Sequence, residues 1–437
     1  INSINVSRSA NASLTIDSNA SLTVVELINS NAEALIIKDG AQLFHNSDNV
    51  KASFTMGIVK PEGEWNENNK TGWQFIASPF TDADVSAFIP DEDRYELYKY
   101  DGGKDYEWIN HKGENFEETS FVSGRAYLAS YETLEKATFS GTFNNAKSHS
   151  WDLSYNAEKP LANFHLVGNP FTFDMDIAKA TFTNLANGVA VVTPAGGYDY
   201  SQTTIPVGDG FFVKATGENP SLSYNHNASV TRRGSESNNS LNITATGNTG
   251  KDNVVINFAG KSEGFNKLQN FNDAIATVYV AEDGKNYGIY NCDADVQEVE
   301  LNFNANKMGN YTISIEPNGK FQTVTLVDRF TGIETNMLVE DYNFTAMSEE
   351  NPNRFVVRFA NGQESTDDSH FVYQSGEELI LNIQGDVQIV DVLGRVVYSG
   401  EANNDINRIN VSSFNSGAYM VRVMNGNDVK VEKVVIY

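Results

Sequence analysis

The octapeptide Trp73-Gln74-Phe75-Ile76-Ala77-Ser78-Pro79-Phe80 recurs in the chain as Phe164-His165-Leu166-Val167-Gly168-Asn169-Pro170-Phe171. In both copies a short apolar run ends at a Pro-Phe turn. Each copy is followed by a glycine turn and a second apolar run, at Val122 to Leu128 and at Val207 to Val213. Apolar runs bounded by turn residues are typical of buried strands. The repeat predicts two related β-sandwich or jelly-roll-like modules, at residues 57–160 and 161–232, as separate domains or as one composite domain.

A second repeat lies near the N-terminus. Leu14 to Leu22 aligns with Leu35 to Leu43, 21 positions later, and apolar and polar residues alternate within each copy. A period near twenty with this alternation indicates stacked rungs of a β-solenoid. The pattern predicts a β-solenoid stub at residues 1–56. Because two rungs bury little apolar surface, we expect either further rungs upstream or cover from the next module.

Strand patterns resume after Thr231 to Asn239, a polar stretch that we interpret as a linker. Seven β-forming runs follow, separated by Gly, Asn and Asp turns: Leu241 to Thr246, Asn253 to Phe258, Ala276 to Val280, Val299 to Phe303, Tyr311 to Ile315, Val324 to Val327 and Phe355 to Phe359. This spacing predicts a third β-sandwich at residues 233–364. Gln363 to His370 is a second polar linker, before a small domain at residues 365–437.

The C-terminal domain carries an ordered series of motifs: Val390 to Tyr398, Ile409 to Phe414, Ser416 to Val423 and Lys430 to Ile436. Gly394 predicts a hairpin turn, and Gly417 a tight bend before a central strand. This order at the C-terminus resembles the sorting domain of type IX secretion cargo in Bacteroidetes. The resemblance implies an immunoglobulin-like domain and export across the outer membrane by the type IX secretion machinery. It also implies release or anchoring at the cell surface.

Two further resemblances concern the context of this domain. Val327 to Gly332, Tyr342 to Thr345 and Asn353 to Val357 resemble a module often placed directly before such sorting domains. The Ser78-Pro79-Phe80 and Gly168 to Phe171 segments resemble modules that accompany it in large surface proteins. In that setting such modules are accessory, and a catalytic domain, where there is one, lies N-terminal to them.

Composition narrows the function classes. Lys and Arg number 31 and Asp and Glu 57, so the formal net charge is −26. Such a chain is repelled by phosphate backbones and anionic lipid, which argues against nucleic-acid and membrane-surface partners. The single cysteine, Cys292, allows no intramolecular disulfide and is expected to be a buried thiol. Helical patterns are confined to Asp84 to Ile89 and Asp174 to Ala180, which predicts an all-β fold.

Paired carboxylates recur after both Pro-Phe turns, as Asp82 with Asp84 and as Asp174 with Asp176. Carboxylates two positions apart can share a calcium ion on a loop. Alternatively, Thr81, Asp82 or Asp174 caps a short helix by accepting backbone N–H bonds. Capping is the stronger expectation, and calcium is the cofactor to be tested.

The hairpin from Tyr95 to His111 is the candidate recognition element. Pairing Tyr98 with Trp108 and Tyr100 with Tyr106 leaves one face of the hairpin wholly aromatic, with Asp101 to Asp105 as the turn. An exposed face of this kind stacks on sugar rings. A buried one is sandwich core, because aromatic side chains supply large apolar areas, and core is the stronger expectation.

Motif searches for a nucleophile elbow, a zinc-binding histidine pair or a phosphate-binding loop are negative. Cys292 with His226 or His370 is the residual candidate for nucleophilic catalysis. The sequence therefore predicts a secreted or cell-surface, non-catalytic protein that serves adhesion, glycan or protein binding, or spacing. The alternative is a secreted glycan-active or peptidase enzyme, or the accessory C-terminal part of one.

Overall fold

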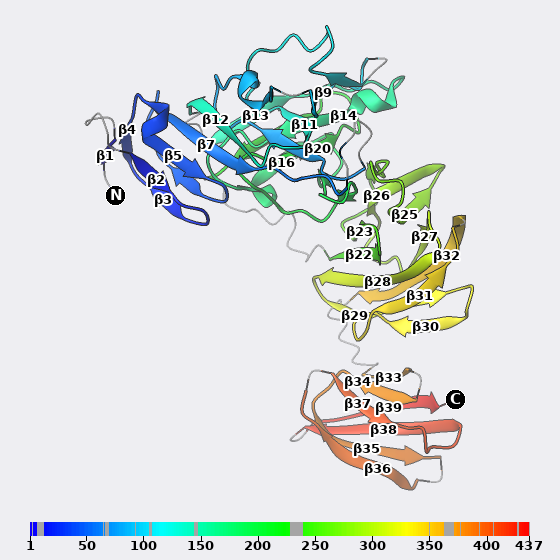
Figure 1. Cartoon of the computed structure of the whole chain (residues 1–437). Helices are drawn as coiled ribbons and strands as arrows, with labels where there is room; N and C mark the ends of the chain where they lie inside the picture. The colour runs from blue at the N-terminus through cyan, green and yellow to red at the C-terminus, as the bar shows by residue number, and fades with distance from the viewer. Residues whose placement is uncertain are drawn as a thin grey trace.

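The computed structural model describes the 437-residue chain except for residues 2, 7–12, 64, 66–69, 92, 105–106, 144–146, 228–238, 349, 362–370, 376, 393, 405, 426–427 and 437. Both predicted linkers fall in these gaps, apart from Asn239. In the described residues the regular elements are strands and short 3-10 turns, without an α-helix, so the all-β prediction is confirmed (Figure 1). The turns η2 (Val85–Phe88) and η4 (Ile177–Lys179) lie where short helical turns were predicted.

The N-terminal strands pair in parallel, at the predicted offset. The elements are β1 (Ser3–Asn5), β2 (Leu14–Ile16), β3 (Ser21–Thr23), β4 (Glu26–Ile28), η1 (Ala32–Ala34), β5 (Leu35–Lys38) and β6 (Gln42–Phe44). Strand β1 pairs with β4, β2 with β5, and β3 with β6. Leu14 lies opposite Leu35 and Leu22 opposite Leu43, as the 21-residue repeat predicts.

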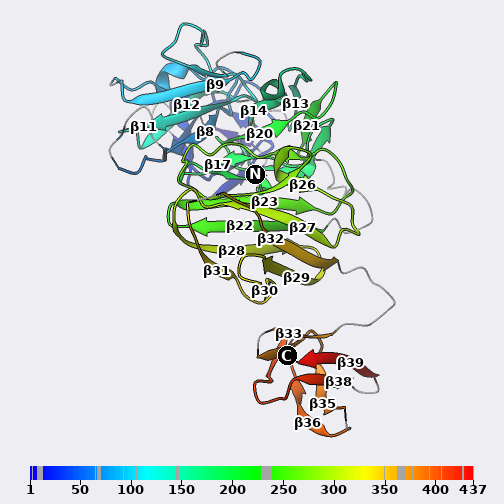
Figure 2. The ribbon, with the colours of Figure 1, turned by 90° about the vertical axis from the view of Figure 1, so that its right-hand side faces the viewer.

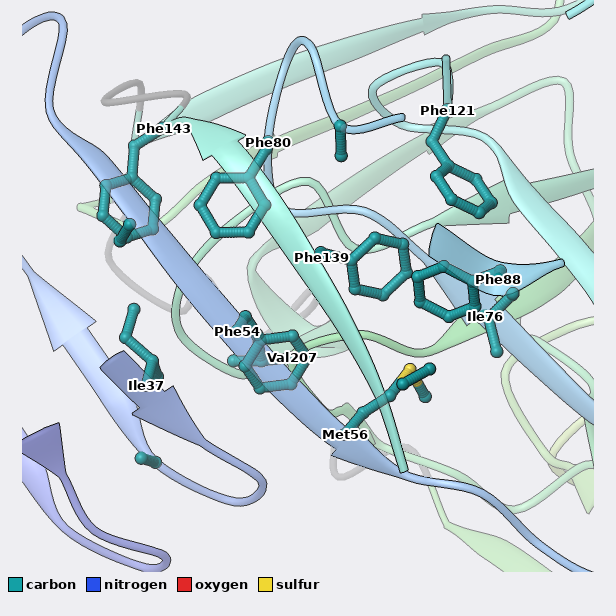
Figure 3. Close-up of a cluster of buried hydrophobic side chains, with 14 of the residues drawn as sticks. Ile37, Phe54, Met56, Ile76, Phe80, Phe88, Phe121, Phe139, Phe143 and Val207 are labelled. Carbon is teal, nitrogen blue, oxygen red and sulfur yellow. The ribbon is translucent and has the colours of Figure 1, made fainter. Parts of the chain in front are cut away.

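Strand β7 (Lys51–Gly57) joins this stack to the next unit (Figure 1). It pairs in parallel with β5, placing Ile37 opposite Phe54, and antiparallel with β12 (Lys136–Thr142) on its other edge. The side chains of Ile37, Phe54 and Phe139 belong to one buried cluster (Figure 3). The following module therefore covers the parallel strands, which is one of the two arrangements expected from the sequence.

The middle of the chain consists of two repeats whose main strand pairs are equivalent. The first contains β7, β8 (Gln74–Ala77), η2, β9 (Tyr95–Tyr100), β10 (Trp108–Asn110), β11 (Ala126–Tyr131) and β12. The second contains β13 (Ser148–Asp152), η3 (Pro160–Asn163), β14 (Phe164–Gly168), β15 (Met175–Asp176), η4, β16 (Ala180–Thr183), β17 (Val191–Val192), β18 (Tyr198–Asp199), β19 (Thr204–Ile205), β20 (Gly210–Lys214) and β21 (Ser221–Asn225). Strand β13 pairs with β21, so residues 148–152 belong to the second repeat, although the sequence placed the module border at residue 160.

Equivalent strands pair in equivalent registers. Strand β8 pairs antiparallel with β11, placing Ala77 opposite Ala126, and β14 pairs with β20, placing Gly168 opposite Gly210. The Pro-Phe turns also match. Ser78 Oγ accepts a hydrogen bond from the N–H of residue 80 (3.1 Å), and Asn169 Oδ1 accepts one from the N–H of residue 171 (2.9 Å). The repeated octapeptide is therefore a strand followed by a side-chain-capped turn in both copies.

The two repeats interlock through their glycine turns. The N–H of Ala77 donates to Gly208 O (2.7 Å), and the N–H of its counterpart Gly168 donates to Gly124 O (2.9 Å). A Cβ added to Gly168 would lie 2.4 Å from the Cβ of Ala77, and one added to Gly210 would lie 2.1 Å from the Cβ of Ala126. These reciprocal contacts relate the repeats by an approximate two-fold arrangement. Side-chain packing also connects the two repeats, because Val207 of the second repeat packs into the core of the first (Figure 3).

The third unit is a single eleven-stranded sheet that turns back on itself (Figure 2). Its strands are β22 (Ser240–Gly247), β23 (Gly250–Asn257), β24 (Phe265–Asn266), β25 (Thr277–Glu282), β26 (Lys285–Asn291), β27 (Glu298–Asn304), β28 (Gly309–Asn318), β29 (Phe321–Asp328), β30 (Ile333–Asn336), β31 (Tyr342–Ala346) and β32 (Glu350–Asn361). Strand β25 pairs with β26 through one half and with β27 through the other, so it links two layers. Side chains from both layers, such as Ile256 and Leu326, fill the core between them.

Three segments of this unit, Val327 to Gly332, Tyr342 to Thr345 and Asn353 to Val357, meet at a buried ion pair. Asp328 is fully buried, and its carboxylate accepts hydrogen bonds from Arg354 Nε (3.0 Å) and Nη2 (2.7 Å). Tyr342 Oη also donates to it, at 2.8 Å. Burial alone would raise the pKa of Asp328, but these bonds and the N–H of Phe330 hold that pKa below its usual value. The guanidinium lies over the ring of Phe344, 4.6 Å from its centroid.

Polar contacts and apolar packing connect the second repeat to the third unit. Tyr200 Oη accepts the N–H of Leu268 (2.7 Å), and the Lys267 ammonium lies 4.5 Å from the Tyr200 ring centroid. Lys267 also forms a buried ion pair with Asp252, at 2.8 Å. Because Tyr200 belongs to the same buried cluster as Ile289, packing crosses the predicted border at residues 232 and 233. The domain limits themselves stay a prediction.

The C-terminal domain has two antiparallel layers around its own core. Its strands are β33 (Val372–Ser375), β34 (Glu378–Leu381), β35 (Gly385–Asp391), β36 (Val396–Ala402), β37 (Asn407–Asn410), β38 (Gly417–Asn425) and β39 (Asp428–Ile436). Gly394, with φ of 81°, makes the predicted turn between β35 and β36, and Gly417 begins the central strand β38. The buried carboxylate of Glu432 accepts the N–H of Val372 (3.1 Å), which joins the last strand to the first.

Substitution of Gly210 tests the interlock. We expect Gly210→Ala to destabilise the chain by about 1–3 kcal/mol, because the new methyl group overlaps that of Ala126. Adding Ala126→Gly removes this overlap and is expected to restore part of the loss, because the new Cβ still lies 3.0 Å from Val167 O. Gly217→Ala is the matched control, since its Cβ would have no neighbour closer than 3.8 Å. Thermal unfolding of the three variants measures the effect, and equal melting temperatures for Gly210→Ala and Gly217→Ala would contradict it.

Removal of one partner of the buried ion pair tests the third unit. Arg354→Met is expected to cost about 3–5 kcal/mol, because it leaves the Asp328 carboxylate buried and uncompensated. Since the folded-state pKa of Asp328 is lowered, its stabilising effect is present above the unfolded value of 3.8 and is lost as pH falls below it. Arg358→Gln, which removes only exposed ion pairs, should cost less than about 1 kcal/mol. Urea unfolding against pH measures both, and similar losses would contradict the assignment.

Candidate functional site

A cleft of about 1200 Å³ lies where the first repeat's aromatic hairpin faces the second repeat. Strands β9 and β10 line one side, and β13 and β14 line the other. Its lining includes the side chains of Tyr100, Trp108, Arg125, His149, Asp152 and His165. The exposed lining is more polar than apolar. Because both walls are strands anchored in shared cores, the geometry of the cleft is set by the packing of the two repeats.

The hairpin forms with a register two residues away from the predicted one. Trp108 lies opposite Tyr100 and Asn110 opposite Tyr98, whereas the sequence analysis paired Trp108 with Tyr98. A shift of two residues keeps each side chain on its face. Tyr98, Tyr100 and Trp108 therefore still share one face, with ring centroids of Tyr100 and Trp108 5.0 Å apart. Tyr106, also predicted on this face, lies outside the described residues.

The aromatic face packs largely against the protein. The Tyr100 ring centroid lies 5.1 Å from that of Phe212 in the second repeat, and that of Trp108 lies 6.0 Å from it. Tyr98 contacts Trp73, at 6.1 Å between ring centroids. Tyr100 Oη donates to Leu161 O (2.9 Å). All three predicted rings are half-buried, so they serve as core, and Tyr100 and Trp108 also line the cleft.

The floor of the cleft is the first glycine turn. Gly124 has φ of 79°, and a Cβ there would lie 2.5 Å from His149 Nε2 and 3.0 Å from Trp151 Nε1. Trp151 Nε1 donates to Gly124 O at 2.7 Å. Only glycine fits beneath these two rings. Trp151 lies in strand β13 and is buried.

A charged network supports one wall. Glu118 accepts hydrogen bonds from Arg125 (2.6 Å), Lys99 (3.2 Å) and the hydroxyl of Tyr127 (2.6 Å). The Lys99 and Glu118 side chains are mostly buried, whereas the Arg125 side chain is 42% exposed. Glu118 therefore fixes Arg125 at the cleft surface with part of its guanidinium accessible.

The two histidines of the cleft favour the neutral form. Burial lowers the pKa of His149, and the nearby Asp152 carboxylate opposes this shift. Burial also lowers the pKa of His165, whose Nε2 lies 2.8 Å from Ser154 O. Neutral imidazoles offer one donor and one acceptor each, as do hydroxyl groups. These two side chains therefore suit neutral hydrogen-bonding groups of a ligand.

Sequence reasoning missed Arg125, His149 and His165 as cleft residues. They come from three separate segments, and only the interlocking of the repeats brings them together. A signal was present for one of them, because Arg125 follows Gly124 in the turn that recurs in both repeats. A glycine turn that recurs in both repeats indicates a place where the two repeats approach each other closely.

The four aspartates considered for calcium each accept a hydrogen bond from a backbone N–H group. Asp84 accepts the N–H of Ser86 (2.7 Å) and caps η2, and Asp176 accepts the N–H of Ala178 (3.0 Å) and caps η4. Asp82 accepts hydrogen bonds from the N–H and hydroxyl groups of Thr142, and Asp174 accepts the N–H of Val207 (3.1 Å). Capping thus occurs, by the second aspartate of each pair rather than the expected first residues.

These carboxylates do not form a metal cluster. Across the described parts of the chain, three or more His, Cys, Asp or Glu side chains nowhere gather as metal ligands would. Calcium binding by the paired aspartates stays a prediction.

Cys292 is a buried thiol in the third unit. Its Sγ lies 3.6 Å from Asn257 O, and burial, helped by Asp293 and Glu282, raises its pKa to about 12. Its thiolate fraction at neutral pH is therefore minute, which disfavours a nucleophilic role. Of its two suggested partners, His226 lies in the second repeat, where its ring contacts Phe173, and His370 lies outside the described residues.

Removal of the capping aspartates tests the role of the paired carboxylates. We expect Asp84→Ala and Asp176→Ala each to lower the melting temperature, because the first N–H groups of η2 and η4 lose their acceptors. The loss should be equal in calcium and in chelator. The unsubstituted chain should also melt at the same temperature in both. A calcium-dependent rise that either substitution abolishes would show metal binding instead.

Comparisons with known proteins match two parts of the chain to protein families. Residues 372–437 match the family described as "Secretion system C-terminal sorting domain", and residues 1–193 match "Domain of unknown function (DUF8693)". No curated protein matches the chain. A solved structure titled "Biofilm associated protein - BSP domain" is similar at 8% identity and a TM-score of 0.15, covering 89% of this chain and 96% of that one. A score this low carries no argument.

The sorting-domain match agrees with the ordered motifs of the last strands and with their two-layer fold. In the described residues no helix is both long and apolar enough to cross a bilayer. The chain is a cargo protein of the type IX secretion system, exported by its C-terminal sorting domain and then attached to the cell surface or released.

Proposed function

We propose that the chain is a secreted, non-catalytic binding protein whose interrepeat cleft takes a glycan. The observation that carries this proposal is the cleft itself, which has about 1200 Å³ of space. That volume exceeds the range of roughly 300–1000 Å³ typical of small-molecule pockets, so an oligosaccharide fits better than a single small metabolite.

The chemistry of the walls favours a sugar. The half-buried rings of Trp108 and Tyr100 supply flat apolar contact, while Arg125, His149 and Asp152 supply directional donors and acceptors. Sugars combine apolar ring faces with many hydroxyl groups, so they satisfy both kinds of surface. An apolar ligand would leave the polar groups unpaired, which costs free energy.

The absence of catalysis belongs to the same proposal. The one thiol is buried with a raised pKa, and burial lowers the pKa of both cleft histidines. We also propose that the parallel N-terminal strands are β-solenoid rungs and that the sorting domain is immunoglobulin-like. Rigid β units with an accessible cleft suit adhesion at the cell exterior.

Blocking the cleft tests glycan binding. Ser150 is exposed on β13 and lines the cleft, so Ser150→Trp fills the space without disturbing a core. Ser148→Trp is the matched control, because Ser148 is exposed on the same face of β13 but does not line the cleft. On a glycan array, we expect Ser150→Trp to weaken binding of the recognised glycan at least tenfold, and Ser148→Trp to leave it unchanged.

The outcomes separate the alternatives. Absence of any bound glycan, or equal binding by both variants, would overturn the glycan proposal. Chromatography of the bound oligosaccharides after incubation checks for chemistry. A shortened product that Ser150→Trp abolishes would show a glycan-active enzyme and contradict the non-catalytic assignment.

A further inference from the structure

The N-terminal stack of parallel strands is covered at one end and open at the other (Figure 1). Strands β1, β2 and β3, here called the open layer, pair on one edge with β4, β5 and β6. At the covered end, β5 pairs with β7 of the first repeat. Among the described residues, no strand pairs with the other edge of β1, β2 or β3. Because an unpaired edge presents free N–H and C=O groups, it can bind a further strand.

The apolar interior of the stack is uncovered at the open end. Three apolar residues of the open layer each lie opposite a leucine of the next layer: Ile4 opposite Leu27, Leu14 opposite Leu35, and Leu22 opposite Leu43. The three leucines of the next layer are 1% exposed or less. Their partners in the open layer are only half-buried. A second apolar surface laid on this end would remove these side chains from water, which is the main driving force for association.

The open layer lacks the features that keep edge strands from pairing. Native proteins protect such edges with charged side chains, proline or β-bulges. The three strands contain only Ser, Asn, Thr, Ile and Leu, and their ladders with the next layer run in continuous register. Each strand is three residues long, so any of them matches any other in length. The edges are therefore open to pairing with strands of the same kind.

The open layer also lies in the uncharged part of a strongly acidic chain. Residues 1–25 contain one basic and one acidic residue, Arg8 and Asp17, so the formal net charge of −26 falls on the rest of the chain. Asp17 itself is paired with Lys38, at 2.5 Å. A net charge of this size keeps copies of a protein apart. Because the open layer adds no net charge to this repulsion, a second copy of the chain can approach there.

We propose that the open layer binds the open layer of a second copy, forming a head-to-head dimer. A two-fold axis in the plane of the contact reverses strand direction, so the facing strands run antiparallel and hydrogen-bond edge to edge. Ile4, Leu14 and Leu22 of the two copies then pack into a shared apolar core. A second copy is the occupant that supplies both an uncharged strand edge and a matching apolar layer. The inference is independent of the glycan cleft, which is lined by β9, β10, β13 and β14.

The mass of the chain in solution tests the proposal. Light scattering of the unsubstituted chain should show a dimer that dissociates on dilution. An acidic variant places three like charges at exposed positions of the open layer: Ser3→Glu, Thr15→Glu and Thr23→Glu. Because like charges then face each other across the contact, the dissociation constant of the dimer should rise about tenfold or more.

The matched control adds the same charge to other edge strands. It carries Ser140→Glu on β12 and Thr181→Glu with Thr183→Glu on β16, all at exposed positions. The control should remain dimeric. Melting temperatures close to that of the unsubstituted chain would show that both variants are folded.

A basic variant completes the experiment. Ser3→Lys, Thr15→Lys and Thr23→Lys together should also give a monomer, and mixing it with the acidic variant should restore a dimer, because opposite charges then face each other. A chain that stays monomeric at every concentration would overturn the proposal and leave a strand of another polypeptide as the occupant. A dimer that the acidic variant leaves intact would place the contact elsewhere and also overturn it. So would acidic and basic variants that melt like the unsubstituted chain but fail to pair when mixed.

Discussion

The middle of the molecule depends on the close approach of two backbones at four small residues, Ala77, Ala126, Gly168 and Gly210. A methyl group added at either glycine would overlap the alanine methyl of the other repeat. That proximity lets Ala77 and Gly168 donate across to the glycine turns of the opposite repeats. Any larger side chain at these positions would separate the sheets, since packed interiors do not absorb extra volume. The interlock makes one structural unit out of two repeats and thereby defines the cleft between them.

The sequence predicted this arrangement only in part. The repeated octapeptide and the two glycine turns did identify strands that pair, and Leu14 does lie opposite Leu35. Alternation of apolar and polar residues identifies such strands from the local sequence alone. The hairpin register failed for a long-range reason. Gly102 in its turn lies against Leu161 of the second repeat, where a Cβ would come within 1.9 Å of a carbonyl oxygen. The turn is therefore shaped by a distant segment, which no local pattern reveals.

The candidate site shows the same limit. Paired aspartates predicted either capping or calcium, and capping occurs, but at Asp84 and Asp176 because the 3-10 turns begin later than expected. The aromatic hairpin was located correctly, and its rings were expected to be core more than recognition surface. His149 and His165 carry no motif, and they became candidates only when the second repeat was seen to face the first. A cleft between repeats is a property of their packing, so its lining is not visible in the spacing of residues within either one.

The two-fold arrangement raises the question of why only one side of the unit opens into this cleft. Gly208 is the counterpart of Gly124, and it faces Phe54 of β7 where Gly124 faces Trp151 of β13. The two strands differ at their other edge. Strand β7 is interior, because β5 pairs with it in parallel, whereas β13 is the edge of its sheet in the described structure. The N-terminal parallel strands thus occupy the space on one side that remains open on the other. By covering the side of Gly208, they leave the cleft beside Gly124 as the open side of the unit, and lining residues outside the interlock can vary without disturbing it.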